Sequence, residues 1–308
     1  MWVLMKPKAL RPGNTIRLVS PASPLPPEKV QAFAQMMEAA GYGVGIGDHA
    51  FAREHYLAGS DELRAADLQA AFADERVDAV VCTRGGYGCA RLMSRLDLDA
   101  IARSEKLFLG FSDITTLHLA LNRRGLPTVH SPVALTFTVD REPWVRESFL
   151  DVLSGRCPIP EAAPRGKTLV PGQAEGVVTG GCLCLITDSI GTPDPIDCNG
   201  KIVLIEDVDE NPHRIDAMLT HLLLSGEIQK AAGIVIGEMT RTDEKEDESI
   251  GGMPWRDIVR DRLGSLDVPS IVGFPFGHCQ NMLSLPLGIR ARLDADAGTL
   301  TYLESICA

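Results

Sequence analysis

The chain has 308 residues, of which 45% are hydrophobic and 23% are charged, and its formal net charge is −11. This composition is that of a folded globular protein long enough for two ordinary domains, and it excludes a disordered chain. The acidic balance also argues against a nucleic-acid partner, because phosphates need a basic face.

The first half of the chain alternates strand and helix patterns. We predict strands at Thr15–Ser20, Gly43–Ile46, Asp78–Cys82, Leu107–Phe111 and Thr128–His130. We predict helices at Pro27–Ala40, Asp61–Phe72, from Ala90–Leu96 onward, and from Ser112 to about Arg123. Alternating units of this size indicate a doubly wound parallel sheet of the flavodoxin or amidotransferase kind, which binds ligands at the carboxyl ends of its strands.

A stretch rich in proline and glycine separates the two halves, and it is poor in helix signals. We therefore expect an N-terminal α/β domain at residues 1–160, a linker at 161–173 and a β-rich domain at 174–308. The strands expected in the second half are Glu175–Thr179, Ile202–Ile205, Gly233–Gly237, Ile271–Gly273, Gly288–Leu293 and Thr299–Leu303. Helices are expected at Pro212–Leu224 and Pro254–Leu263, and Arg241–Glu248 reads as a solvated charged loop. The pattern favours a smaller domain built on a β-barrel-like sheet.

Several features bear on the compartment. The apolar run in Met1–Lys8 is too short for a signal peptide, and no stretch is long enough to cross a bilayer. Several of the eight cysteines lie in apolar, strand-like runs, which is typical of free thiols in a reducing compartment. Cys182-Leu183-Cys184 alone lacks the four spaced ligands of a zinc site. We expect a cytoplasmic protein with no membrane partner, no metal and no cofactor.

Ser112 directly follows the predicted strand Leu107–Phe111 and opens a helix. A serine on such a strand-to-helix turn presents its hydroxyl at the carboxyl edge of the sheet, beside the free N–H groups of the helix start. That arrangement suits a nucleophile. The alternative is a helix cap, because both Ser112 and Asp113 can accept backbone N–H groups.

Two further strands end in chemically useful side chains. The strand Lys201–Asp207 ends in carboxylates, among them Glu206, and the apolar strand Pro269–His278 ends in a histidine. A serine, a glutamate and a histidine at strand ends are the parts of an acyl-transfer triad. Asp207 is the local competitor of Glu206 for the acidic position. The glycines of Arg84-Gly85-Gly86-Tyr87-Gly88 permit close approach of backbone to a ligand and can supply an oxyanion donor.

Taken in order along the chain, these segments resemble the LD-carboxypeptidase family of serine peptidases. The resemblance spans nearly the whole chain and rests on Leu10–Ile16, Ser20–Ser23, Arg84–Gly88, Gly110–Asp113, His130–Pro132, Gly180–Leu183, Ile205–Asp207 and Gly277-His278. It implies a C-terminal β-barrel-like domain and a triad that crosses the domain interface, with Ser112 on one side and Glu206 and His278 on the other. It also implies a homodimer.

The mechanism that follows is serine-dependent amide hydrolysis. His278 takes the Ser112 proton, Glu206 orients the imidazole, and the N–H groups of Gly86 and Asp113 hold the oxyanion. The resemblance implies a peptide substrate with an L,D bond, chiefly the murein tetrapeptide that loses its terminal D-alanine in cell-wall recycling. Arg84, with Gly85 of the glycine loop, is the candidate for binding the free carboxylate of the leaving residue.

Two departures from the family pattern put the substrate in question more than the reaction. Cys182 stands where we expect asparagine, and Ser131 stands where glycine is common. One alternative is therefore the microcin C self-immunity branch, which cleaves aminoacyl-nucleotide analogues with the same triad. A second is a non-catalytic protein that binds a ligand in the interdomain cleft. A thiol-dependent amidotransferase is disfavoured, because the turn bears serine and not cysteine.

Overall fold

The computed structural model describes residues 5–247, 249 and 251–308. The start of the N-terminal run weighed as a signal peptide, Met1–Leu4, and the last residue of the charged loop, Glu248, lie outside these residues. The chain forms two compact units. Unit 1 runs to Pro160 and also contains Leu283–Gly288 and Ser305–Ala308, whereas unit 2 contains Glu161–Met282 and Ile289–Glu304.

Unit 1 is built on a six-stranded sheet whose strands have the order β11-β5-β4-β3-β1-β2. Its five parallel strands are β1 (Thr15–Val19), β2 (Gly43–Ile46), β3 (Ala79–Cys82), β4 (Leu107–Gly110) and β5 (Thr128–His130). Their order is that of a flavodoxin-like sheet, so the predicted doubly wound fold is confirmed. The sixth strand, β11 (Leu285–Leu287), pairs antiparallel with β5.

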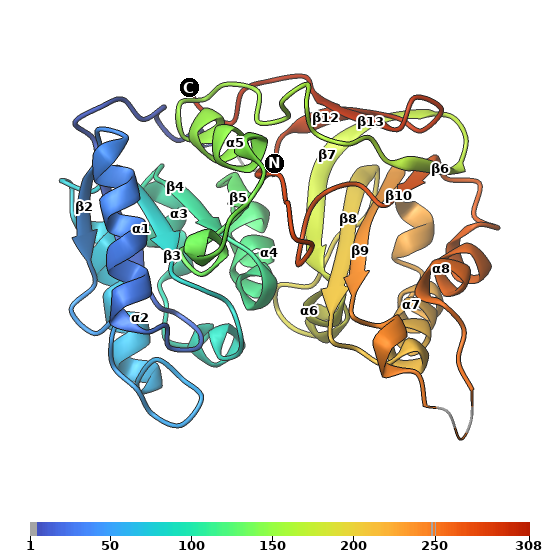
Figure 1. Cartoon of the computed structure of the whole chain (residues 1–308), viewed down its shortest axis with the longest axis horizontal. Coiled ribbons are helices and arrows are strands. Elements are labelled where there is room, and N and C mark those ends of the chain that lie inside the picture. The colour runs from blue at the N-terminus through green and yellow to red at the C-terminus, as the bar shows by residue number, and fades with distance from the viewer. Residues whose placement is uncertain (1–4, 248, 250) are drawn as a thin grey trace. The chain divides into compact units, whose positions relative to one another are not determined.

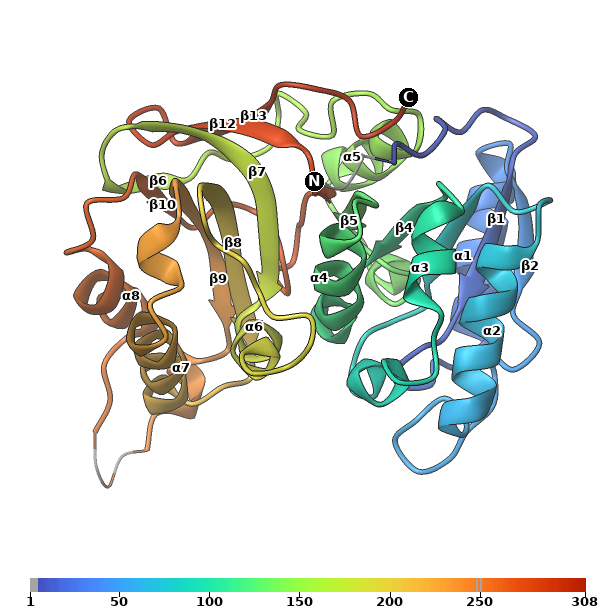
Figure 2. The same cartoon turned by 180° about the vertical axis from the view of Figure 1, so that it is seen from behind.

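Helices cover both faces of this sheet (Figures 1 and 2). One face is covered by α1 (Pro27–Ala39) and α5 (Pro143–Leu153), and the other by α2 (Asp61–Ala73), α3 (Leu98–Arg103) and α4 (Thr115–Arg123). Proline at the first position fits the start of α1, and the Ser60 hydroxyl caps α2 by accepting the Leu63 N–H. On the first face, Phe33 of α1 packs edge-on against Phe149 of α5.

The helix expected from Ala90–Leu96 is wrong. Cys89–Leu92 forms only a short 3₁₀ turn, and the regular helix of this region is α3. The carboxylate of Asp97 accepts the Ala100 N–H at 2.8 Å and so fixes the start of α3 at Leu98, six residues after the turn ends at Leu92. An N-cap aspartate of this kind satisfies a helix donor that would otherwise be unpaired.

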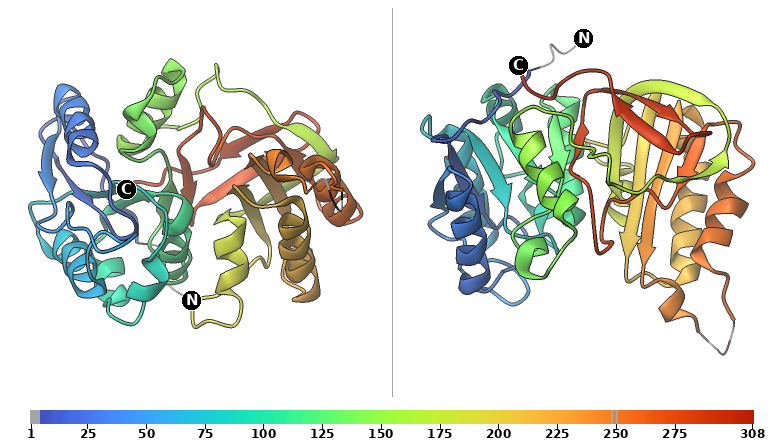
Figure 3. Two further views of the ribbon diagram at one scale, coloured as in Figure 1. Left: turned by 60° about the horizontal axis from the view of Figure 1, so that its bottom comes forward. Right: turned by 45° about the horizontal axis from the view of Figure 1, so that its top comes forward.

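Unit 2 is built on a seven-stranded sheet with the order β13-β12-β7-β8-β9-β10-β6. Four parallel strands occupy its middle: β7 (Gln173–Cys182), β8 (Lys201–Val208), β9 (Gly233–Thr240) and β10 (Ser270–Val272). Antiparallel strands flank them: β6 (Lys167–Val170), β12 (Arg290–Asp294) and β13 (Thr299–Tyr302). The sheet is curled into a half-barrel (Figure 3), which confirms the predicted β-barrel-like unit.

One face of this second sheet is covered by α6 (Leu183–Ser189), α7 (Pro212–Leu224) and α8 (Trp255–Leu263) (Figure 2). β6 lies inside the segment 161–173 that we expected to be a linker, and α5 and α6 had no counterpart among the predicted helices. The chain returns to unit 1 at residues 283–288 and 305–308, and the predicted domain boundaries did not include these two segments. Across the described part of the chain, we find no helix with the length and apolar character that a membrane span requires.

Candidate active site

Ser112 occupies a strained turn at the carboxyl end of β4. Its φ is +66°, in the left-handed region that a residue with a side chain rarely adopts. A 3₁₀ turn, Ser112–Ile114, follows at once and leads into α4. The turn is tight, because a Cβ placed on Gly110 would lie 2.9 Å from the Ile114 side chain. A serine held in such a conformation fits the nucleophile interpretation, because strained backbone of this kind clusters at active sites.

The glycine loop after β3 lies directly against this serine. A Cβ on Gly85 would come within 2.7 Å of the Ser112 Cβ and 2.9 Å of the Phe111 carbonyl, so only glycine fits there. Gly86 has a φ of +116°. Ser23, in the loop after β1, accepts the Tyr87 N–H at 3.3 Å and donates its own N–H to the Gly85 carbonyl at 3.4 Å. Loops after β1, β3 and β4 therefore meet at one edge of the sheet.

The side chain of Asp113 fixes the far end of that loop. Its carboxylate accepts the Cys89 N–H at 2.8 Å from a buried position, and burial raises the pKa of this carboxyl above its usual range. Asp113, the residue next to the candidate nucleophile, thus fixes the position of the glycine loop that packs against Ser112. The sequence offers the Asp113 side chain only as a helix cap, so this contact with the glycine loop adds to the sequence-based interpretation.

Arg64 of α2 also contacts the glycine loop, and this residue was not identified from the sequence. Its guanidinium is fully buried, donates to the Gly88 carbonyl at 3.1 Å and to the Gly59 carbonyl at 3.3 Å, and pairs with Asp61. An arginine in a helix is normally expected to be solvated. The one local signal for a paired arginine is that Arg64 comes three residues after Asp61.

Arg84 is half-buried at the start of the loop. Its Nε donates to the Gly85 carbonyl at 3.1 Å and its Nη1 donates to the Pro24 carbonyl at 3.3 Å. Desolvation lowers the pKa of the guanidinium, which still carries its charge at neutral pH. Unit 1 therefore brings Ser112, Asp113, Gly85, Gly86 and Arg84 together.

Unit 2 brings together the other two candidates, Glu206 and His278. The His278 Nδ1 lies 2.7 Å from the Glu206 Oε2, and the His278 backbone N–H donates to the same oxygen at 3.1 Å. Glu206 is fully buried at the end of β8, where the register with β9 shifts between Ile205 and Asp207. A Cβ on Gly277 would overlap the Glu206 carboxyl group, so glycine is required beside the histidine.

Electrostatics act on His278 in two directions. Burial lowers the pKa of the imidazole, but the negative charge of Glu206, the hydrogen bond to it and the charge of Asp207 outweigh burial and raise the pKa above its usual value. Because a carboxylate only accepts hydrogen bonds, the neutral imidazole places its proton on Nδ1 and leaves Nε2 as the basic nitrogen. That is the state a general base needs.

Asp207, the competitor of Glu206, makes different contacts. One oxygen accepts the Cys184 N–H at 2.9 Å and the other accepts the Val208 N–H at 2.7 Å. Burial, together with the adjacent charge of Glu206, raises the pKa of Asp207 to about 6. The hydrogen-bonded carboxylate partner of the His278 ring is thus Glu206.

A histidine–carboxylate pair also occurs in unit 1, although the sequence shows no partner pattern for His49. Its Nδ1 lies 2.8 Å from the Asp67 Oδ1. His49 follows β2, which is separated from β4 by β3 and β1. Three strand spacings amount to roughly 14 Å, so the strand order argues against a role for this pair in activating Ser112.

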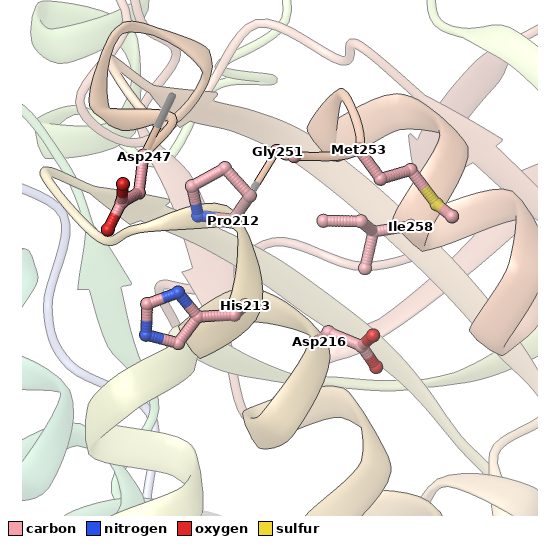
Figure 4. Close-up of a pocket in the computed structure, with 8 residues that line it drawn as sticks. Pro212, His213, Asp216, Asp247, Gly251, Met253 and Ile258 are labelled. Atoms are coloured by element: carbon pink, nitrogen blue, oxygen red, sulfur yellow. The ribbon is translucent and has the colours of Figure 1, made fainter. Parts of the chain in front are cut away.

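Other histidines have structural roles or lie elsewhere. His118 is buried in α4, its Nε2 lies 2.9 Å from the Gly110 carbonyl, and burial lowers its pKa to about 3, which keeps it neutral. His213 lines a cavity of about 140 Å³ in unit 2 with Asp216 and Asp247 (Figure 4). The lining of that cavity includes neither Glu206 nor His278.

Comparison with known proteins identifies the family of the chain. Residues 16–131 match the model of the LD-carboxypeptidase N-terminal domain, and residues 175–293 match that of the LD-carboxypeptidase C-terminal domain. A Bacillus subtilis protein named probable murein peptide carboxypeptidase is 36% identical over 295 residues, which cover 94% of this chain and 91% of the relative. The chain belongs to the LD-carboxypeptidase family.

Two solved structures share the fold. The muramoyltetrapeptide carboxypeptidase from Oxalobacter formigenes has a TM-score of 0.80 and 28% identity, with 93% of this chain and 97% of that chain covered. The microcin C7 self-immunity protein MccF, solved in complex with aspartyl sulfamoyl adenosine, has a TM-score of 0.85 and 22% identity, with 98% and 99% covered. The second likeness bears on the fold alone.

Proposed function

We propose that this protein is a serine peptidase that hydrolyses an L,D-peptide bond, with Ser112 as nucleophile, His278 as general base and Glu206 as the carboxylate that orients it. The observation that carries the proposal is the left-handed backbone of Ser112 at the carboxyl end of β4. A serine that only ended a strand would relax to an ordinary conformation, whereas a nucleophile turn needs this strain to expose its hydroxyl.

The hydrogen-bonded pair in unit 2 supports the base assignment. With Nδ1 bound to Glu206, the His278 Nε2 accepts the Ser112 proton as the hydroxyl oxygen attacks the scissile carbonyl. Glu206 stabilises the imidazolium that results. The imidazolium then protonates the leaving amine, and water hydrolyses the acyl-enzyme with His278 again as base. The proposal requires Ser112 of unit 1 and His278 of unit 2 to meet in the working enzyme.

The N–H groups of Gly86 and Asp113 are the proposed oxyanion donors. Support comes from the absence of a side chain at Gly85, which lets the loop pack on Ser112, and from the Asp113 carboxylate, which fixes the loop at Cys89. Loss of one donor in such a site costs about 10²–10³ in rate. Arg84 and the backbone at Gly85 are the proposed partners of the substrate carboxylate.

We propose a murein tetrapeptide as the substrate and its terminal D-alanine as the leaving residue. The names of the Bacillus subtilis relative and the Oxalobacter formigenes structure support this substrate class. The alternative, cleavage of an aminoacyl-nucleotide analogue, is supported only by a fold likeness at 22% identity.

The remaining proposals concern the setting of the enzyme. Eight free cysteines favour a reducing compartment such as the cytoplasm. The family resemblance suggests a homodimer, which sedimentation of the purified chain would test. We also propose the two units as separate domains, joined near residues 161–173.

The decisive experiment incubates the native chain and Ser112→Ala with a murein tetrapeptide and, separately, with an aminoacyl-adenylate analogue, followed by mass spectrometry. We expect loss of one D-alanine from the tetrapeptide with the native chain alone. Cleavage of the analogue instead would establish the self-immunity function. A serine-directed fluorophosphonate distinguishes these two enzymatic functions from a non-catalytic protein that binds a ligand in a cleft. With either enzyme it should label Ser112 in the native chain and label it far more slowly in His278→Ala.

A further inference from the structure

Three side chains of types that can ligate a metal ion converge in unit 2 at the junction of β7, β8 and α6. Cys182 ends β7, Cys184 is the second residue of α6, and Asp207 belongs to the neighbouring strand β8. One donor atom from each residue lies within 4.8 Å of the other two. The Sγ atoms of the two cysteines are 3.4 Å apart, and the Cys182 Sγ is 3.6 Å from the Asp207 Oδ1.

The S···O distance matches the edge of a tetrahedral zinc site, and the S···S distance is about 0.4 Å shorter than its edge. With Zn–S bonds of about 2.3 Å and Zn–O bonds of about 2.1 Å, tetrahedral angles separate two sulfurs by about 3.8 Å and a sulfur from an oxygen by about 3.6 Å. A disulfide would need the sulfurs at about 2.05 Å. The pair is therefore nearer to the spacing of two thiolates on one cation than to that of a bond between them.

The surroundings also suit a cation. Cys182 and Asp207 are buried, and Glu206 adds a second buried carboxylate at the preceding position of β8. Cys184 is only partly buried and so offers an entry path and room for water as a fourth ligand. The Cys184 N–H donates to the Asp207 Oδ2, which holds the carboxylate in place before any ion arrives.

We propose that Cys182, Cys184 and Asp207 form a binding site for a soft divalent cation such as Zn²⁺, with two thiolates and one carboxylate oxygen as its protein ligands. Binding displaces the protons of the two thiols to solvent and leaves the oxidation state of sulfur and metal unchanged. The cation lies one residue from Glu206, yet the site does not depend on the proposed peptidase reaction. The sequence hides it, because the third ligand comes from a strand more than 20 residues away.

The test titrates the reduced, metal-free full chain with Cd²⁺ and follows thiolate-to-cadmium charge-transfer absorption. We expect a band that saturates at one equivalent and disappears when a strong chelator removes the Cd²⁺. Cys184→Ser should weaken binding at least about tenfold, as even loss of an outer-shell partner does, and reduce the band. Asp207→Asn should keep a two-thiolate band with similarly weakened affinity.

Two matched thiol variants serve as controls. Cys279→Ser removes a partly buried thiol from the same unit, and Cys157→Ser removes an exposed one from unit 1; both should bind Cd²⁺ as the native chain does. The proposal is overturned if the native chain gives no saturable band, or if Cys184→Ser titrates like the native chain. Because Cys184 is partly exposed, this variant should fold even if Asp207→Asn does not, and circular dichroism without metal checks both.

Discussion

His278 binds one oxygen of Glu206 twice, through its ring Nδ1 at 2.7 Å and through its backbone N–H at 3.1 Å. The second bond ties the carboxylate to the chain itself, so the ring cannot turn without leaving a fixed acceptor. The imidazole orientation is therefore set before any substrate binds.

The first prediction concerns pH. Since the pKa of His278 is raised by Glu206, kcat/KM should increase with pH through a pKa above about 6.5, as the imidazole loses its proton. Glu206→Gln removes the charge, so this limb should move to lower pH while kcat falls at least about 10²-fold. Rates measured from acid to alkaline pH with a chelator present test this. An unmoved limb in Glu206→Gln would contradict the assignment.

The same shift has a consequence for stability. A raised pKa in the folded state means that protonated His278 favours folding below the unfolded pKa, and that this contribution disappears as pH rises through the folded value. Glu206→Gln should reduce this pH dependence of the free energy of unfolding. Urea denaturation of both proteins across that range measures it.

The strained turn at Ser112 predicts a difference in stability between two inactive variants. Ser112→Gly should be more stable than Ser112→Ala by about 1 kcal/mol, because glycine adopts a φ of +66° without the Cβ clash. Both variants should lack peptidase activity. Denaturant unfolding of the pair gives the difference, and equal stabilities would argue that the turn relaxes in solution.

Substitution of Gly277 should reduce activity by displacing Glu206, an effect that backbone strain at a positive φ alone does not produce. In Gly277→Ala the new methyl group overlaps the Glu206 carboxyl group, and a displacement near 1 Å can cost about 10²-fold in rate. Gly191→Ala is the matched control, because Gly191 also has a positive φ, +87°, but faces open space. Peptide hydrolysis by the two variants should therefore differ greatly, while both lose some stability.

Arg64 predicts a large loss of stability from a polar residue. Arg64→Ala leaves the Gly88 and Gly59 carbonyls without this donor, so we expect a loss of about 3 kcal/mol or more in the free energy of unfolding. Arg91→Ala removes the exposed partner of the same Asp61 carboxylate and should unfold close to the native chain. Similar unfolding of the two variants would refute the role given to Arg64.

Arg84 predicts a change in specificity. If its guanidinium binds the free carboxylate of the leaving residue, Arg84→Ala should raise KM for the tetrapeptide and leave KM for a C-terminally amidated analogue nearly unchanged. Steady-state kinetics on both substrates test this. An equal loss on the amidated analogue would show that Arg84 only shapes the loop through Gly85 and Pro24.

Much of the fold could be predicted, because each βα repeat of unit 1 has a strong local pattern. β11 could not, since Leu285-Pro286-Leu287 is three residues long, contains proline, and joins a sheet formed by residues far earlier in the chain. β6 was hidden in the same way: it is a short, exposed strand within a proline-rich stretch, and only its pairing with β10 makes it a strand.

The candidate site shows the same division. Ser112, Glu206 and His278 follow apolar strands, so their placement at strand ends could be inferred from local sequence. The choice between Glu206 and Asp207 could not be made on spacing, because it depends on which carboxylate the His278 ring contacts. Arg64 of α2 and the side chain of Asp113 contact the glycine loop, which is distant from both in sequence, and no local pattern predicts these contacts.

The pairing of β11 with β5 bears on how the protein is made. The first 160 residues leave the ribosome exit tunnel well before Leu285–Leu287. During that time β5 is an unpaired edge of an otherwise formed sheet. The nascent first unit becomes complete only after Leu283–Gly288 and Ser305–Ala308 have been synthesised. Shortening the chain before Leu283 should thus yield an aggregation-prone product rather than a free-standing first unit.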